Sequence, residues 1–292
     1  MFSLVAHRDS WTNAALLARP WPGRPSVRLT PFEALEGLGA GDIALGRLDV
    51  RASLDGVESG LWALDVLAER GVTVLNEAQP LLRAHDKLAT ARLLARAGLP
   101  HPSTRLVFPG RPFPAVRPPV VVKPRFGSWG RDVLLCPTEA ALAAALIALN
   151  ERPWFAVHGA IVQDLVQPRG FDVRLVVAGG EVIGAIERHA APGEWRTNIA
   201  LGGTRTPYVP DAATLGLARA AALASELDLV GVDLLPSDGG WVVLELNGAA
   251  DFTEEYAPEG DPFSAAIAAL ARVAAARGDA PPTAAGLVPE PV

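Results

Sequence analysis

Short apolar runs alternate with helical patterns over the first eighty residues. The apolar runs are 2–6, 42–48 and 72–75, and a helical pattern covers 60–71. Strands that alternate with helices indicate a small α/β domain around a mostly parallel sheet, which we expect over 1–82. This part of the chain has no Gly-x-Gly-x-x-Gly motif, so a dinucleotide site is not predicted there.

After residue 82 the pattern changes, and we expect 83–277 to form a second, larger unit. A helix is predicted over 86–98, with Asp86 as its N-cap and Gly98 as its end. The further expected elements are a strand at 103–108, a proline-rich linker at 109–119, strands at 120–124, 133–136, 161–166, 172–177 and 181–188, and helices at 138–150, 212–227 and 262–277.

This unit is predicted to have three parts. They are a connecting helix and linker over 83–119, a small α+β subdomain over 120–166, and a C-terminal subdomain over 167–277. The tail 278–292 is rich in Pro and Ala, and we expect it to be disordered.

Near the C-terminus the sequence predicts a hairpin. Two short apolar strands, 229–235 and 241–247, are separated by the turn sequence Pro-Ser-Asp-Gly-Gly. Because successive strand side chains point to opposite faces, Val243, Glu245 and Asn247 are expected to share one face of the second strand. A charge on an otherwise apolar strand needs a partner.

The hairpin could supply ligands for a metal ion. Asp233 lies on its first strand, so Asp233, Glu245 and Asn247 together would offer three oxygen atoms to a hard cation such as Mg²⁺. The hairpin alone leaves a second interpretation open, in which the pair is a solvated strand edge or a satisfied polar pair.

Two lysines and a glycine loop indicate phosphate binding. Lys123 ends an apolar strand, and Gly127 and Gly130 in the loop that follows would let backbone N–H groups approach phosphate oxygens. Lys87 begins a helix, where a lysine is unfavourable unless a negative group such as a phosphate lies nearby. A glycine turn and a surface lysine are the alternatives, and the spacing of a Walker A loop is absent.

Isolated arginines suit small anionic ligands. Asp172 and Arg174 share a strand face by the two-residue period, as expected for the wall of a polar cleft. Arg174, Arg188 and Arg196 could bind a carboxylate or a phosphoryl group through bidentate contacts, although each alone could be a surface residue.

Composition excludes several classes of function. The chain has 292 residues, is 50% hydrophobic and has a formal net charge of -6, without a cluster of Lys and Arg, so nucleic acid is not an expected partner. The single cysteine, Cys136, excludes a disulfide framework and a thiolate metal cluster. With no signal-like N-terminus and no long uncharged apolar run, we expect a cytoplasmic protein without membrane insertion.

Taken in order, the motifs resemble the ATP-grasp superfamily and, within it, the RimK-type carboxylate–amine ligases, which include LysX-like enzymes. The resemblance covers about 72–270 and implies an α/β (α+β) ATP-grasp fold, in which two α+β subdomains sandwich ATP next to a small N-terminal α/β domain. The motifs are His85-Asp-Lys87, Val121-Val-Lys-Pro124, Gly127-Ser-Trp-Gly130, Gln163-Asp164, Gly170-Phe-Asp-Val-Arg174, Trp195-Arg-Thr-Asn198, Gly231-Val-Asp233 and Glu245-Leu-Asn247.

The resemblance also implies roles for single residues. The residues implied to bind ATP are Lys87 and Lys123 at its phosphates, the flexible flap Gly127, Ser128, Trp129 and Gly130, the adenine hinge Gln163, Asp164 and Leu165, and Asp172 near the ribose. Arg196 and Asn198 are implied to lie over the ATP phosphates and the reacting centre, and Arg174 is a further candidate catalytic residue. Asp233, Glu245 and Asn247 would bind two Mg²⁺ ions, for which Mn²⁺ could substitute. Family members often have Glu in place of Asp164, so that contact would be shorter here.

The implied reaction joins a carboxylate to an amine through an acyl phosphate and releases ADP and phosphate. The implied substrates are ATP, an amino acid such as glutamate, and a protein, carrier-protein or small-molecule acceptor, and the protein could form a homo-oligomer. The acidic stretch 248–256 would line the amine side and could favour a cationic group or be solvated. It resembles the LysX-like branch more than the glutamate-adding one.

Two other classes of protein remain as alternatives. An ATP-binding module without ligase activity would be favoured by the loss of a metal ligand or a phosphate lysine, and none is lost. A purely structural α/β protein would leave Asp233, Glu245, Asn247 and both lysines without a shared purpose.

Overall fold

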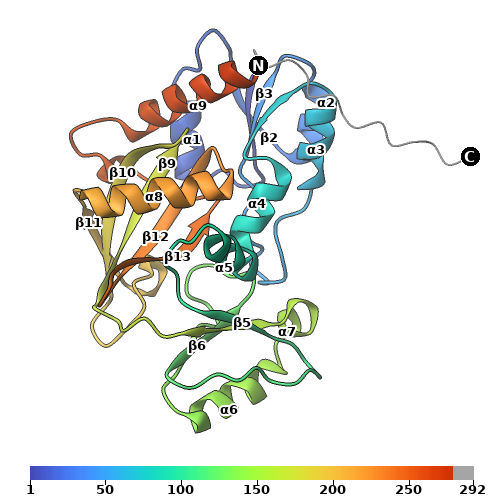
Figure 1. Ribbon diagram of the computed structural model, residues 1–292. Helices are drawn as coiled ribbons and strands as arrows, with labels where there is room; N and C mark the ends of the chain where they lie inside the picture. Colours follow the sequence, from blue (N-terminus) through green and yellow to red (C-terminus); the bar gives the residue numbers. More distant parts are fainter. Residues whose placement is uncertain (279–292) are drawn as a thin grey trace, which may run out of the picture.

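Three β-sheets organise residues 1–278, the part of the chain that this computed structural model describes (Figure 1). The N-terminal sheet is parallel, as the alternating pattern predicts, with strand order β2-β1-β3-β4. Its elements are β1 (Phe2–Val5), α1 (Trp11–Leu17), β2 (Ser26–Leu29), α2 (Pro31–Gly37), β3 (Ile43–Gly46), α3 (Trp62–Glu69) and β4 (Thr73–Leu75). Helix α2 begins at Pro31 because Thr30 and Glu33 form a capping box around its first turn.

The smallest body of the structure is an antiparallel sheet of order β5-β8-β6-β7, at the bottom of Figure 1. Strand β5 joins this sheet by pairing with β8, although it lies in the segment 83–119 that we assigned to the connection. The elements are β5 (Thr104–Val107), β6 (Val120–Pro124), β7 (Leu134–Cys136), α6 (Glu139–Leu149), α7 (Pro153–His158) and β8 (Ala160–Asp164). The sequence patterns did not predict α7, which is only six residues long.

The C-terminal sheet is antiparallel, with strand order β11-β10-β9-β12-β13. Helices α8 and α9 pack on opposite faces of this sheet, so that Val173 and Leu175 share a core with α8 while Val176 and Ala178 share one with α9. The elements are β9 (Phe171–Ala178), β10 (Glu181–His189), a short 3₁₀ turn (Ile199–Leu201), β11 (Thr204–Pro207), α8 (Ala212–Ser225), β12 (Leu229–Ser237), β13 (Gly240–Asn247), a second 3₁₀ turn (Glu254–Tyr256) and α9 (Pro262–Gly278).

The N-terminal and C-terminal sheets share their hydrophobic cores. Val5 and Leu81 pack with residues of β9 and α8, and Phe2 packs with residues of α9. Helices α4 (Ala78–His85) and α5 (Lys87–Arg96) connect these sheets to the small sheet, whose core is largely its own. Asp86 caps α5 as predicted, by accepting hydrogen bonds from the N–H groups of Leu88 and Ala89.

The hairpin β12–β13 forms as predicted, but a β-bulge changes which residues share a face. Asp233 pairs with Glu245, whereas Leu234 pairs with Val243, which leaves Leu244 as the extra residue. Val243 therefore enters the hydrophobic core, while Glu245 and Asn247 face a cavity. The prediction that Val243 shares their face is wrong, because the two-residue alternation is interrupted at the bulge.

The structure bears on two further predictions, the disordered C-terminal tail and the absence of membrane insertion. The predicted disordered tail, 278–292, lies outside the described residues except for Gly278, which ends α9. Over residues 1–278, the structure contains no helix with the length and apolar character needed to cross a bilayer. The cytoplasmic location stays a prediction.

Candidate functional site

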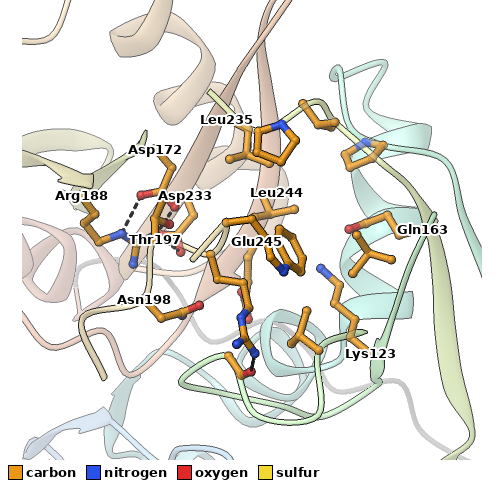
Figure 2. Close-up of a pocket in the computed structure, with 18 of the residues that line it drawn as sticks. Lys123, Gln163, Asp172, Arg188, Thr197, Asn198, Asp233, Leu235, Leu244 and Glu245 are labelled. Carbon is orange, nitrogen blue, oxygen red and sulfur yellow. Dashed lines mark hydrogen bonds and ion pairs between the residues drawn. The ribbon is translucent and has the colours of Figure 1, made fainter. Parts of the chain in front are cut away.

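A cavity of about 150 Å³ lies between the small sheet and the C-terminal sheet, and we call it the first cavity. Every residue that the sequence predicts for the site lines it, including the segments from α5, the small sheet and the hairpin. Figure 2 shows Lys123 and Gln163 on one side of this cavity and Asp172, Arg188 and Asp233 on the other. Residues far apart in sequence thus meet at one place.

The fold explains why charged residues face this cavity. Along β9, the face that packs Val176 and Ala178 against α9 carries Asp172 and Arg174 nearer the start of the strand. The same face of β9 therefore lines the cavity near the start of the strand and packs in the core near its end, and the two-residue alternation of side chains is unbroken. As predicted, Asp172 and Arg174 share a strand face.

Arginines surround the carboxylate of Asp233. Arg174 donates to it through Nε at 2.6 Å and Nη2 at 2.7 Å, and Arg188 donates through Nη2 at 2.9 Å. Burial alone would raise the pKa of Asp233, but the charges and hydrogen bonds of Arg174 and Arg188 outweigh it and hold that pKa well below its usual range. Asp233 is therefore ionised at neutral pH.

Arg188 bridges two buried carboxylates. Besides its bond to Asp233, it donates to Asp172 through Nε at 2.8 Å and Nη2 at 2.5 Å. The sequence identified Arg188 as a candidate anion ligand and did not place it in the site. The signal that could have placed it is its position on a strand that neighbours Asp172 and Arg174.

Lys87 donates to Oε1 of Glu245 at 2.6 Å and to the carbonyl oxygen of Gly127 at 2.5 Å. The negative group that a lysine at a helix start requires is thus a carboxylate of the hairpin. Lys123 is buried with 6% exposure. Burial lowers the pKa of Lys123 to about 8, although the nearby charge of Glu245 acts in the opposite direction.

The glycine loop contacts the segment that carries Arg196 and Asn198. Arg196 donates through Nη1 to the carbonyl oxygen of Gly130 at 2.8 Å, while Glu194 holds the same guanidinium at 2.6 and 3.0 Å. Hydrogen bonds from Arg196 lower the pKa of Glu194 to about 2. Gly130 has φ +70°, and a Cβ there would lie 2.6 Å from Oδ1 of Asn198, so both the backbone and the space require glycine.

The donor set of the hairpin fits a hard cation. Asp233, Glu245 and Asn247 bring two carboxylates and a carboxamide to the first cavity, and the buried Nδ2 of Asn247 has no partner among the described residues. Rotation of the carboxamide by 180° would place its oxygen there instead. Within residues 1–278, no three His, Cys, Asp or Glu side chains could hold a metal by themselves, so a bound ion would also need oxygens from a substrate or water.

Comparisons with known proteins agree on one family. A family model described as a RimK-like ATP-grasp domain matches residues 84–258, more than half of the chain. A probable alpha-L-glutamate ligase of Parasynechococcus marenigrum is 34% identical over 187 residues, which are 61% of this chain and 39% of that relative. The glutamate–LysW ligase ArgX of Sulfurisphaera tokodaii is 31% identical over 216 residues, 72% of this chain and 76% of the relative.

Solved structures show the same fold. A RimK domain ATP-grasp protein from Sphaerobacter thermophilus has a TM-score of 0.67 at 24% identity and covers 91% of this chain and 98% of its own. The D-alanine–D-alanine ligase of Bacillus anthracis has a TM-score of 0.71 at 14% identity and covers 95% and 97%. At these identities the likeness concerns the fold alone.

Proposed function

Because this chain belongs to the RimK-like ATP-grasp family, we propose that it is an ATP-dependent ligase that joins a carboxylate to an amine. The family and the ATP-grasp fold that the motif order predicts are confirmed. The ligase names of the relatives support the activity. One substrate is an amino acid, glutamate or similar, and the acceptor is a protein, a carrier protein or a small molecule.

One observation carries this proposal: the two lysines, the glycine loop, the three arginines Arg174, Arg188 and Arg196, and the three oxygen donors of the hairpin converge on the first cavity. Lys87 and Lys123 would bind the phosphates of ATP, and the loop 127–130 would cover them. Gln163, Asp164 and Leu165 would border the adenine. Asp172, whose two oxygens each accept one hydrogen bond from Arg188 and keep a free lone pair, would contact the nucleotide near the ribose.

Asp233, Glu245 and Asn247 would hold Mg²⁺, with two ions proposed and Mn²⁺ as a possible substitute. The metal would neutralise negative charge on the phosphates. Most of the catalysis of phosphoryl transfer comes from such charge stabilisation and from positioning. Lys87 would exchange its present bond with Glu245 for a phosphate oxygen when ATP binds. Arg174 and Arg196, with Asn198, would position the reacting groups and neutralise their developing charge.

The reaction would proceed in two displacements. A carboxylate oxygen forms a bond to the γ-phosphorus of ATP while the bond from that phosphorus to the β–γ bridging oxygen breaks, which gives an acyl phosphate and ADP. The amine nitrogen then forms a bond to the acyl carbon, the carbon–oxygen bond to phosphate breaks, and the nitrogen loses a proton. Phosphorylation is needed because a carboxylate has no good leaving group.

The products of ATP turnover test this function. We expect sustained release of ADP and phosphate only when both a carboxylate and an amine are present, because the amine is needed to consume the acyl phosphate. A panel of amino acids and candidate acceptors, with mass spectrometry of the amide, measures this. Release of AMP and pyrophosphate would refute the acyl-phosphate route. Nucleotide binding without turnover across the panel would favour a silent ATP-binding module.

The affinity for ATP is expected to fall as the pH rises from about 7 to about 9. Burial lowers the pKa of Lys123 to about 8, so its ammonium loses the positive charge that attracts phosphate over this range. Calorimetry at several pH values measures the effect. Lys123→Arg should remove this pH dependence because a guanidinium stays charged, whereas Lys123→Ala should weaken binding already at pH 7. Unchanged affinity in the alanine variant would count against the phosphate contact.

A further inference from the structure

A second cavity, of about 210 Å³, adjoins the first. Asp233 and Glu245 line only the first cavity, and Asp49, His85 and the segment 249–256 contribute only to the second. The residues that line both are Ser128, Trp129, Arg174, Arg188, Asn198 and Asn247. A molecule in the second cavity would therefore meet the transferred phosphoryl group at this shared wall.

On the C-terminal sheet, the arginines that face the second cavity are already matched by carboxylates. Arg174 and Arg188 bind Asp233, and Arg188 also binds Asp172. Arg205, the third arginine in the lining, forms an ion pair with Glu255, with 2.5 Å between Nε and Oε2. This wall thus has no excess of positive charge with which to bind an additional anion.

Around Asp49 and Asp251, away from these arginines, the lining of the second cavity has more negative than positive charge. Asp49 and Asp251 line it, and Glu58 lies behind Asp49. Arg8 forms ion pairs with both Asp49 and Glu58, and its Nε lies 3.4 Å from Oε1 of Glu58. The buried Arg47 lies 3.5 Å from Oδ1 of Asp251. Three carboxylates therefore share two guanidinium groups.

Backbone N–H groups donate to Asp49, from Val50 at 2.7 Å, and to Glu58, from Asp49 at 2.9 Å, so Asp251 is the carboxylate left with the weakest compensation. His85 shares a hydrogen bond of 2.9 Å with the carbonyl oxygen of Leu48, and burial lowers its pKa, so that its imidazole is neutral near pH 7. Asp251 accepts one hydrogen bond from the hydroxyl of Ser10, at 3.0 Å, and its side chain is 59% exposed. A carboxylate is thus available to a ligand.

We propose that the amine substrate binds in the second cavity and carries a second positively charged group, as a basic amino acid or a diamine does. Ile186 and Ile199 in the lining suit the alkyl stem of such a molecule. Glutamate would instead bring two carboxylates towards Asp49 and Asp251, where like charges repel. This inference rests on the proposed ligase function, and for the amine substrate it replaces the glutamate proposed above and printed in the relatives' names with a cationic molecule.

Calorimetry on the full chain, saturated with ADP and Mg²⁺, tests the inference with L-lysine, putrescine and L-glutamate as probes. We expect lysine or putrescine to bind at least about 10-fold more tightly than glutamate, the effect of roughly one additional charge contact. Glutamate binding as tightly as the better cationic probe, or no binding of either cationic probe, would overturn the inference. Failure of ADP and Mg²⁺ to bind in the preceding titration would instead contradict the proposed function.

Substitutions at Asp251 test whether its carboxylate binds the second positive charge of the amine substrate. Asp251→Asn should weaken binding of the cationic probe about 10-fold, and Asp251→Lys should shift the preference towards glutamate. Glu69→Gln, on an exposed part of α3, is the matched control and should change neither affinity. Unchanged binding of the cationic probe in both Asp251 variants, with thermal unfolding like that of the wild type, would refute this role of Asp251.

Discussion

Replacing Glu245 with alanine is expected to abolish Mg²⁺-dependent ATP turnover while leaving the fold intact. Glu245 faces the first cavity opposite Asp233, and its carboxylate contacts Lys87. Its strand is held by Val243 and Leu246, which lie in the core and are not changed. Loss of even an outer partner of a metal ligand costs about 10- to 100-fold, so loss of a ligand should exceed that range.

ADP release measured against Mg²⁺ concentration checks this result, with circular dichroism and thermal unfolding as tests of the fold. Glu181→Ala is the matched control, because Glu181 is an exposed residue of β10 whose ion-pair partner within residues 1–278 is the exposed Arg272. Full turnover with a normal Mg²⁺ dependence in the Glu245 variant would refute the metal assignment. Loss of turnover in the control would show that the assay responds to unspecific damage.

Replacing Asp233 with alanine is expected to lower the free energy of unfolding by about 3–5 kcal/mol, the usual cost of removing one partner from a buried ion pair. Asp233 is 3% exposed, and its removal leaves Arg174 without its bidentate partner and Arg188 with only Asp172. The variant should also lose Mg²⁺-dependent turnover. Unfolding by urea, followed by fluorescence, measures the change.

Asp238→Ala provides the comparison for this stability effect. Asp238 is likewise paired with an arginine, Arg169, at 2.6 Å, but its side chain is 95% exposed. Solvent screens such a pair, and its loss should change the free energy of unfolding by less than about 1 kcal/mol. A similarly small decrease in the free energy of unfolding in both variants would contradict the view that Asp233 stabilises the fold by compensating the charges of Arg174 and Arg188.

The residues predicted for the site all line the first cavity, and their types and local spacing are what made them candidates. Their roles stay predictions. Lys87 is the clearest case, since its position at a helix start predicts a negative group nearby. The structure supplies that group as Glu245, 158 residues away, where the sequence suggested only a nucleotide phosphate. The sequence indicated the need for a partner but could not identify the partner.

Arg188 and the second cavity show the limit of this reasoning. Arg188 binds Asp172 and Asp233 only because β9 lies between β10 and β12, and this strand order is not encoded in any one strand. Asp49 and Asp251 are 202 positions apart in the sequence, and they line one cavity because the N-terminal and C-terminal sheets share cores. Asp49 belongs to no motif, whereas Asp251 lies in the acidic stretch 248–256 that the sequence predicted to line the amine side.

The sequence by itself indicated the family, many of the elements and a set of residues that line the first cavity, because helix caps, strand alternation and glycine positions depend on neighbours a few residues away. The tertiary structure decided the bulge at Leu244, the partners of the buried charges and the charge of the second cavity. All three features depend on which apolar faces pack together. The hydrophobic effect favours burial of an apolar face but is not directional, so the face alone does not determine which element it packs against.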